Sequence, residues 1–128
     1  RNWSDGLLDA VRAAHDGATP QGLFKRYEYA FDAAYREHVE PSEALQDIAV
    51  IEGMGGATQT ERVFTRPGDP DHVINIKFYR RGEPLKLSKV IPPLEHLGLN
   101  VAQEATYEVT PGDGLPPCII HDFRTEEG

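Results

Sequence analysis

Apolar residues recur at steps of three and four through the first half of the chain, which is the spacing of amphipathic helices. The pattern predicts a first helix over residues 7–14 that ends at Asp16-Gly17. Thr19-Pro20 then supplies a cap and a proline at the first helical position, where the missing N–H costs nothing. We expect this second helix to continue unbroken, because its apolar positions keep their period: Leu23, Phe24, Tyr27, Ala30, Phe31, Ala34 and Tyr35.

A third helix is predicted to follow residue 40, with Ser42 in the position of a helix cap. We expect Leu45, Ile48 and Ala49 to face inward along it. The glycine-rich residues 53–56 (GMGG) then end the helix. A dinucleotide-binding turn needs its glycines before a helix, so that the helix N-terminus meets the pyrophosphate. These glycines follow a helix, and we interpret them as a helix end.

The period changes from helical to alternating after residue 60, which indicates strands. Two strands are predicted, over residues 62–66 and 72–80. Pro, Gly and Asp fill residues 67–71 between them, so we expect an antiparallel hairpin. In the second strand Asn75 and Lys77 fall on the face opposite to three apolar residues: Ile74, Ile76 and Phe78.

The last third of the chain predicts one more helix and two strands. The helix covers residues 87–97, and a long alternating strand follows over residues 99–109. The final strand is predicted over residues 118–124, where the neighbours Ile119 and Ile120 point to opposite faces and are both apolar. An edge strand with one wet face rarely has this pattern, so we expect the final strand to lie inside the sheet.

The predicted elements are two helices followed by helix, strand, strand, helix, strand, strand. A ferredoxin-like sheet has the order β-α-β-β-α-β, and moving its first strand to the end of the chain gives this order. We therefore predict an α+β sandwich with N-terminal helices and a permuted ferredoxin-like, four-stranded, mainly antiparallel sheet. We expect a helical extension over residues 1–40, packed on a sheet domain over residues 41–128, as one compact unit.

Length and charge narrow the classes of protein. A chain of 128 residues suffices for one domain and is too short for an enzyme with its own cofactor domain. The 13 Lys plus Arg and 21 Asp plus Glu give a formal charge of −8, which disfavours binding to nucleic acid or an anionic membrane. No apolar run approaches the roughly 20 residues that span a bilayer. We expect a soluble piece of a longer chain.

The side chains that could carry chemistry do not form a site in the sequence. The single cysteine, Cys118, is expected to be a small buried apolar residue, and its isolation favours a reducing, cytoplasmic location. The five histidines lack the spacing of a metal site. His121 and Asp122 are strand neighbours on opposite faces, so we favour a strand-end hydrogen bond over one acid–base unit. The residues alone predict no catalytic, cofactor-binding or metal site.

Four strings occur together in one order: residues 26–37 (RYEYAFDAAYRE), 78–88 (FYRRGEPLKLS), 94–99 (LEHLGL) and 120–123 (IHDF). This set resembles the N-terminal regulatory part of the large bacterial NAD-specific glutamate dehydrogenases, in particular their third ACT-like segment. The likeness covers nearly the whole chain. The family pattern has a proline where this chain has Asp32, which again implies an unbroken second helix.

The resemblance implies that residues 41–128 are an ACT-like domain. It implies a non-catalytic regulatory or assembly module of an enzyme that oxidises L-glutamate to 2-oxoglutarate with NAD. The NAD-binding and hydride-transfer residues would lie outside this chain, which would itself hold no cofactor. Its partners would be other domains of a cytoplasmic, oligomeric parent enzyme. The alternative is a protein–protein interaction module that binds no small molecule.

ACT-like modules generally bind amino acids where the end of a strand meets a neighbouring helix. In the permuted order this implies an effector site at Arg124 and Thr125, completed by Ser42 near the start of the third helix. We expect at most millimolar amino-acid binding by this chain alone.

Overall fold

The computed structural model of the chain describes residues 2–14 and 19–128, and it divides them into two compact units. The helical unit holds the described residues up to Gly56 together with Tyr107–Cys118. The sheet unit holds Ala57–Thr106 and Ile119–Gly128. The expected domain boundary after residue 40 stays a prediction.

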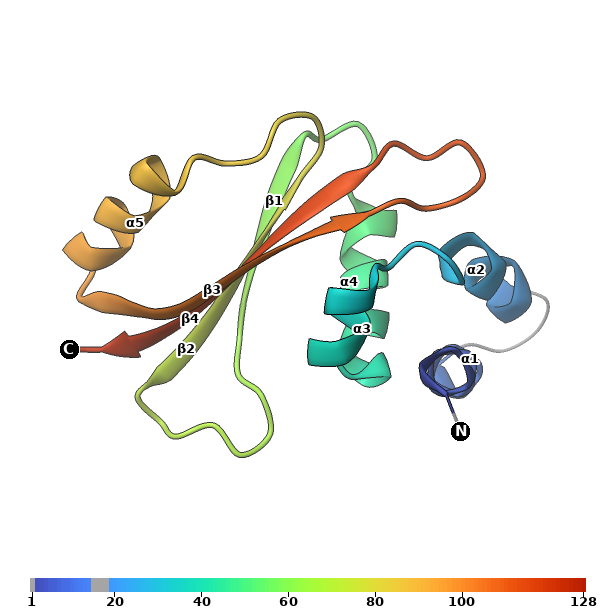
Figure 1. Cartoon of the computed structure of the whole chain (residues 1–128), viewed down its shortest axis with the longest axis horizontal. Coiled ribbons are helices and arrows are strands. Elements are labelled where there is room, and N and C mark those ends of the chain that lie inside the picture. The colour runs from blue at the N-terminus through green and yellow to red at the C-terminus, as the bar shows by residue number, and fades with distance from the viewer. Residues whose placement is uncertain (1, 15–18) are drawn as a thin grey trace. The chain divides into compact units, whose positions relative to one another are not determined.

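Four helices make up most of the helical unit: α1 (Trp3–Ala14), α2 (Thr19–Tyr27), α3 (Ala33–His38) and α4 (Pro41–Gly53) (Figure 1). The Asn2 side chain caps α1 by accepting the backbone N–H of Asp5 at 2.8 Å. Leu7 and Val11, one helical turn apart, are fully buried. The predicted end of the first helix at Asp16-Gly17 lies outside the described residues.

The expectation of an unbroken second helix is wrong. The helix ends at Tyr27, and a new one begins after Asp32, whose carboxylate accepts the backbone N–H of Tyr35 at 2.9 Å. Between the two helices, Phe31 forms an isolated antiparallel bridge with Val109. The apolar period continues through this break because the intervening turn also faces the core. Asp32 is therefore a helix cap.

The expectation that Ser42 caps the third predicted helix is also wrong. The N-cap of α4 is Glu40, and Pro41 occupies the first turn, where a proline is tolerated. Ser42 therefore lies one position inside the helix, and it is exposed. At the other end α4 stops at Gly53, so the interpretation of residues 53–56 as a helix end is confirmed.

Aromatic rings form much of the core of the helical unit. Phe31 and Tyr35 stack with their centroids 4.3 Å apart, and Tyr107 meets Tyr35 edge to face at 5.2 Å. Trp3 meets Phe31 edge to face and donates its indole N–H to the carbonyl of Val39 at 2.8 Å. The aromatic series of the sequence is thus a packing core. Among the described residues, no helix has both the length and the apolar character needed to cross a bilayer.

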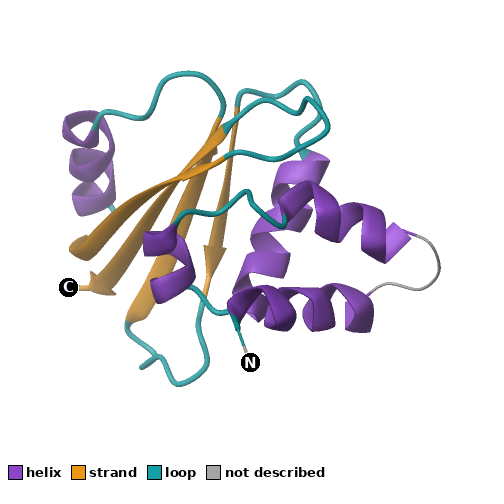
Figure 2. Cartoon of the chain, turned by 45° about the vertical axis from the view of Figure 1, so that its right-hand side comes forward, coloured by secondary structure: helices purple, strands orange, loops and turns teal. Residues whose placement is uncertain are grey.

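The sheet has the predicted permuted order. Its strands are β1 (Gln59–Phe64), β2 (Val73–Arg80), β3 (Leu99–Val109) and β4 (Cys118–Glu127), arranged as β1-β2-β4-β3 (Figure 2). β1 and β2 form the expected antiparallel hairpin, and β2 also pairs antiparallel with β4. The last strand is therefore interior, as the two adjacent isoleucines predicted. Cys118, at its start, is buried as expected.

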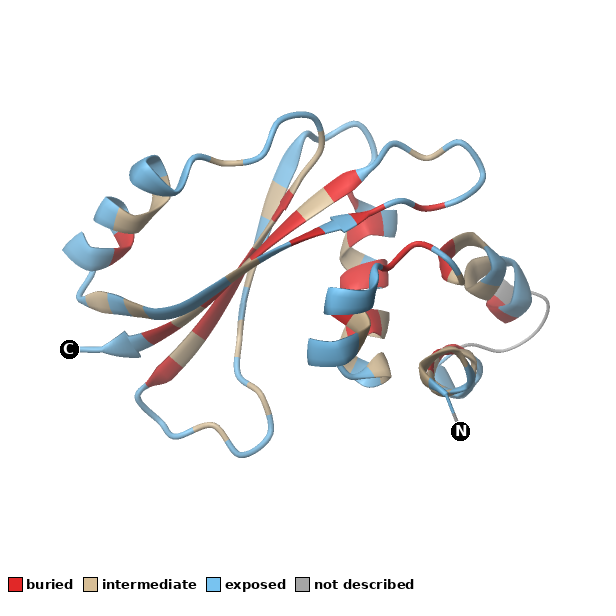
Figure 3. Cartoon of the chain, viewed as in Figure 1, coloured by how far each residue is buried: buried red, intermediate tan, exposed pale blue. Residues whose placement is uncertain are grey.

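One face of the sheet unit is covered by α5 (Leu87–His96). Buried residues gather along β2 and β4 (Figure 3). On this face Ile76, Phe123 and Leu94 of α5 form the centre of the cluster, with partly buried neighbours around them: Ile74, Phe78, Val90, Ile91, Leu99 and Val101. The helix then gives way to β3 through Gly98, which adopts a left-handed φ of 83° that favours glycine.

Replacing Asp32 tests the break between α2 and α3. The Asp32→Ala variant removes the cap, so we expect the free energy of unfolding to fall by about 1 kcal/mol. Urea denaturation of the chain measures this change. Asp32→Asn is the control, because asparagine caps a helix about as well as aspartate. An asparagine variant as unstable as the alanine variant would contradict the capping role.

Candidate functional site

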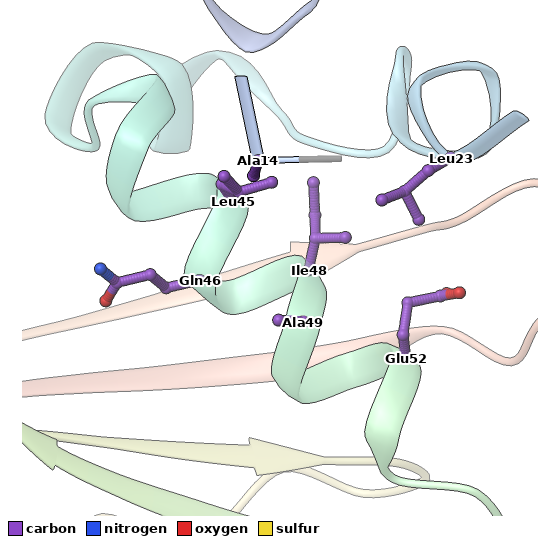
Figure 4. A pocket seen from close by; sticks show the side chains of 7 residues that line it. All are labelled: Ala14, Leu23, Leu45, Gln46, Ile48, Ala49 and Glu52. Atoms are coloured by element: carbon purple, nitrogen blue, oxygen red, sulfur yellow. The ribbon is translucent and has the colours of Figure 1, made fainter. Parts of the chain in front are cut away.

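The helical unit contains an apolar pocket of about 510 Å³, a volume within the range of small-molecule sites (Figure 4). Side chains from three helices line it: Ala14 of α1, Leu23 of α2, and Leu45, Gln46, Ile48, Ala49 and Glu52 of α4. The lining is aliphatic apart from Gln46 and Glu52. The pocket thus offers an apolar surface with polar groups confined to α4.

The helical period of α4 places this surface on one side of the helix. Leu45, Ala49 and Glu52 follow one another at steps of four and three, so they share a face. Ile48, between them, is buried, as the sequence predicted. Ala49 is exposed and lines the pocket, so the expectation that it faces the core is wrong. Its small side chain leaves the space open.

The charged group of the pocket is already paired within the chain. One carboxylate oxygen of Glu52 accepts from Arg26, and the other accepts the Tyr27 hydroxyl at 2.7 Å. Arg26 also donates to Asp113 at 3.0 Å, in the turn between β3 and β4. Burial, with the Glu52 carboxylate beside it, raises the pKa of Tyr27 far above its usual range. Tyr27 therefore keeps its proton and remains a donor.

A polar network of charged and amide side chains lies in the sheet unit. Asp69 accepts the Arg66 backbone N–H at 2.8 Å, the Asn75 amide at 2.7 Å and the Arg124 guanidinium at 2.8 Å. The Arg66 side chain donates to Asn75 at 2.9 Å and to Asp122 at 2.8 Å. Residues from β2, β4 and the hairpin loop are thereby tied together. Neither the alternation of β2 nor the sequence of the loop predicts this network.

The Arg66 backbone N–H, together with Asn75 and Arg124, lowers the pKa of Asp69 from 3.8 to about 2. All three donors favour the ionised carboxylate. Because the pKa is lower in the folded state than in the unfolded state, Asp69 stabilises the fold above about pH 4. That contribution is lost as the pH falls towards 2.

The predicted effector residues have partners inside the chain or lie in different units. The Arg124 side chain pairs with Asp69, and the Thr125 hydroxyl donates to the carbonyl of Ile74 at 2.7 Å. These neighbours in β4 point to opposite faces of the sheet. Ser42 belongs to the helical unit, whereas Arg124 and Thr125 belong to the sheet unit. Effector binding by these three residues stays a prediction.

His121 and Asp122 do not form one acid–base unit. The Asp122 carboxylate pairs with Arg66, whereas His121 accepts the backbone N–H of Leu85 at 3.0 Å. The two side chains therefore have separate partners, and they lie inside β4, not at its end as expected. Within residues 2–14 and 19–128, no group of three His, Cys, Asp or Glu side chains could hold a metal ion.

The permuted order of helices and strands, with a four-stranded sheet closed by an interior last strand, defines an ACT-like α+β module. Residues 59–127 match the family model of the glutamate dehydrogenase ACT3 domain. Residues 10–54 match that of glutamate dehydrogenase helical motif 2. The chain belongs to the NAD-specific glutamate dehydrogenase family.

Curated relatives agree with this family over nearly the whole chain. NAD-specific glutamate dehydrogenase of Halomonas elongata is 36% identical over 98% of the chain. The proteins of the same name from Mycobacterium tuberculosis and Pseudomonas aeruginosa are 33% and 29% identical over 97% and 96% of the chain. The chain spans only 7–8% of the length of these relatives.

The Asp69→Asn variant tests the polar network through the pH dependence of the protein's stability. Asparagine has no carboxylate to protonate, so we expect its stability to fall less steeply than that of the wild type between pH 4 and pH 2. Thermal unfolding across this range measures the slope. Asp71→Asn, at an exposed position of the same loop, is the control and should leave the slope nearly unchanged. Equal slopes for Asp69→Asn and the wild type would disprove the role of Asp69.

Proposed function

We propose that this chain is a non-catalytic regulatory or assembly module of an NAD-dependent glutamate dehydrogenase. The observation that carries the proposal is the match of residues 59–127 to the ACT3 domain of glutamate dehydrogenase. The parent enzyme would oxidise L-glutamate to 2-oxoglutarate with NAD, using residues beyond this chain. The parent would be cytoplasmic and oligomeric, and other domains of the same enzyme would be the partners of this one.

Within this proposal, the pocket favours assembly over recognition of a free amino acid. An amino acid carries a carboxylate and an ammonium group, and the loss of their hydration on binding is costly unless the site supplies partners. Glu52, the charged residue of the pocket, already accepts from Arg26 and Tyr27. An aliphatic side chain needs no such partner and gains from burial. The occupant would be an aliphatic segment elsewhere in the parent, since the chain spans 7–8% of its relatives.

Ligand binding by the chain alone separates a sensor from an assembly module. We expect NAD to leave the melting temperature unchanged, and amino acids to raise it only at millimolar concentrations. Thermal-shift titrations with NAD and with the common amino acids measure both effects, because a ligand that binds the folded state stabilises it once its concentration exceeds the dissociation constant, and the effect grows with the logarithm of that concentration. A saturable rise at tens of micromolar of one amino acid would instead favour a sensor, and Arg124, Thr125 and Ser42 would then be mutated first.

The Ala49→Arg variant tests assembly in the full-length enzyme. Ala49 is exposed, so the isolated chain should keep its fold and its melting temperature. In the full-length enzyme we expect the backbone amides of α4 to exchange more slowly than in the isolated chain. The variant should weaken that extra protection about tenfold, equivalent to about 1.4 kcal/mol. Hydrogen exchange with mass spectrometry measures both proteins.

The Ala13→Arg variant is the matched control. Ala13 is an exposed alanine of α1 outside the pocket, so its change should leave the protection of α4 intact. Equal protection of α4 in the full-length enzyme and in the isolated chain would contradict assembly through the pocket.

A further inference from the structure

His121 is a buried histidine whose two ring nitrogens have fixed and different roles. The residue is 2% exposed and lies in β4, on the sheet face that α5 covers. Its Nε2 accepts the backbone N–H of Leu85 at 3.0 Å, so Nε2 carries no proton. The proton of the neutral ring is therefore on Nδ1.

The proton on Nδ1 fits the groups on its other side. Nδ1 lies 3.3 Å from the Thr106 hydroxyl oxygen, to which it donates. The Thr106 hydroxyl in turn donates to the Glu104 carboxylate at 2.6 Å. The Leu85 N–H, the Nδ1–H of His121 and the Thr106 hydroxyl each have an acceptor only when the ring is neutral.

The Leu85 amide belongs to residues 81–86, which connect β2 to α5 and which we name the strap. The strap begins where the Arg81 N–H bonds the carbonyl of Thr58 at 2.9 Å. Arg80, the last residue of β2, donates to the carbonyl of Glu83 at 3.0 Å. Further along, the Leu85 amide is bound to the His121 ring. This side chain thus ties the last part of the strap to the sheet.

Protonation would place a second N–H against the Leu85 N–H. Two donors cannot share a hydrogen bond, so a closed strap disfavours the imidazolium form of His121. We propose that His121 is a proton-operated latch, which holds the strap on the sheet when its ring is neutral and releases the strap when Nε2 is protonated. The inference concerns the sheet unit alone and does not depend on the proposed function.

The surroundings of the ring oppose its charge in the closed state. Burial lowers the pKa of His121 below its usual 6.5; Glu104 of β3 acts against this effect, and Arg80 of β2 adds to it. α5 contributes the apolar side chains of Val90, Ile91 and Leu94 to this face. An open strap exposes the ring to water, where its pKa returns towards 6.5.

The direction of the pH dependence follows from this difference. The open state binds the proton more tightly than the closed state, so falling pH favours opening. Opening becomes about tenfold more frequent for each pH unit below 6.5, until the closed state is itself protonated. Above pH 6.5 the frequency of strap opening no longer changes with pH through His121.

Hydrogen exchange of the Leu85 amide, followed by NMR on the 128-residue chain between pH 5 and pH 8, tests the latch. After correction for the intrinsic exchange rate, we expect its protection to be constant above pH 6.5 and to fall about tenfold per unit below it. The ring nitrogen shifts of His121 should show the Nδ1–H form at pH 7.5. Protection of Leu85 that does not change with pH, or a ring protonated on Nε2 at pH 7.5, would overturn the proposal.

Three variants identify the group responsible. His121→Gln keeps an acceptor but does not titrate, so its Leu85 protection should lose the acid dependence. Glu104→Gln removes the carboxylate that favours the imidazolium, so the fall in protection should extend to lower pH. His96→Asn, at an exposed position of α5, should behave as the wild type. If His121→Gln does not fold, an unchanged profile in Glu104→Gln, or a changed one in His96→Asn, contradicts the latch.

Discussion

The pairing of β4 inside the sheet is the constraint on which the sheet depends. β4 pairs with β2 over eight residue pairs, from Val73 with Glu126 to Arg80 with Ile119, and it lies beside β3 on its other side. Residues 81–118 must therefore form a loop before β2 and β4 can pair. The entropy cost of closing this loop precedes the hydrogen bonds between these two strands. The strand that completes the sheet is the last one in the sequence.

Much of this architecture could be predicted from the sequence, because periodicity and turn residues act locally. The alternation of residues 72–80 and the adjacent Ile119 and Ile120 were enough to place two strands, one of them in the interior. The break between α2 and α3 was missed, because the apolar period continues through Phe31 and hides the capping role of Asp32. Spacing alone does not separate a continuous helix from two helices whose connecting turn also faces the core.

The candidate site was harder to predict, because its contacts join distant residues. Arg26 lies 26 residues from Glu52 and 87 from Asp113, so no local motif connects them. Asn75 and Lys77 fall on the polar face of an alternating strand, yet both are fully buried. For Asn75 the reason is the partners that Arg66 and Asp69 supply, which satisfy its amide away from water. Alternation predicts on which face of a strand a residue lies. Whether that residue is buried depends on what the rest of the chain places against that face.

The buried position of Cys118 also gives the chain its own chemical probe. It carries the single thiol of the sequence, with no measurable exposure, at the first residue of the interior strand. A thiol reagent in water therefore reacts only when a local opening exposes this side chain, and the alkylation rate reports how often such openings occur. The local opening of the protein around Cys118 can thus be measured without an engineered label.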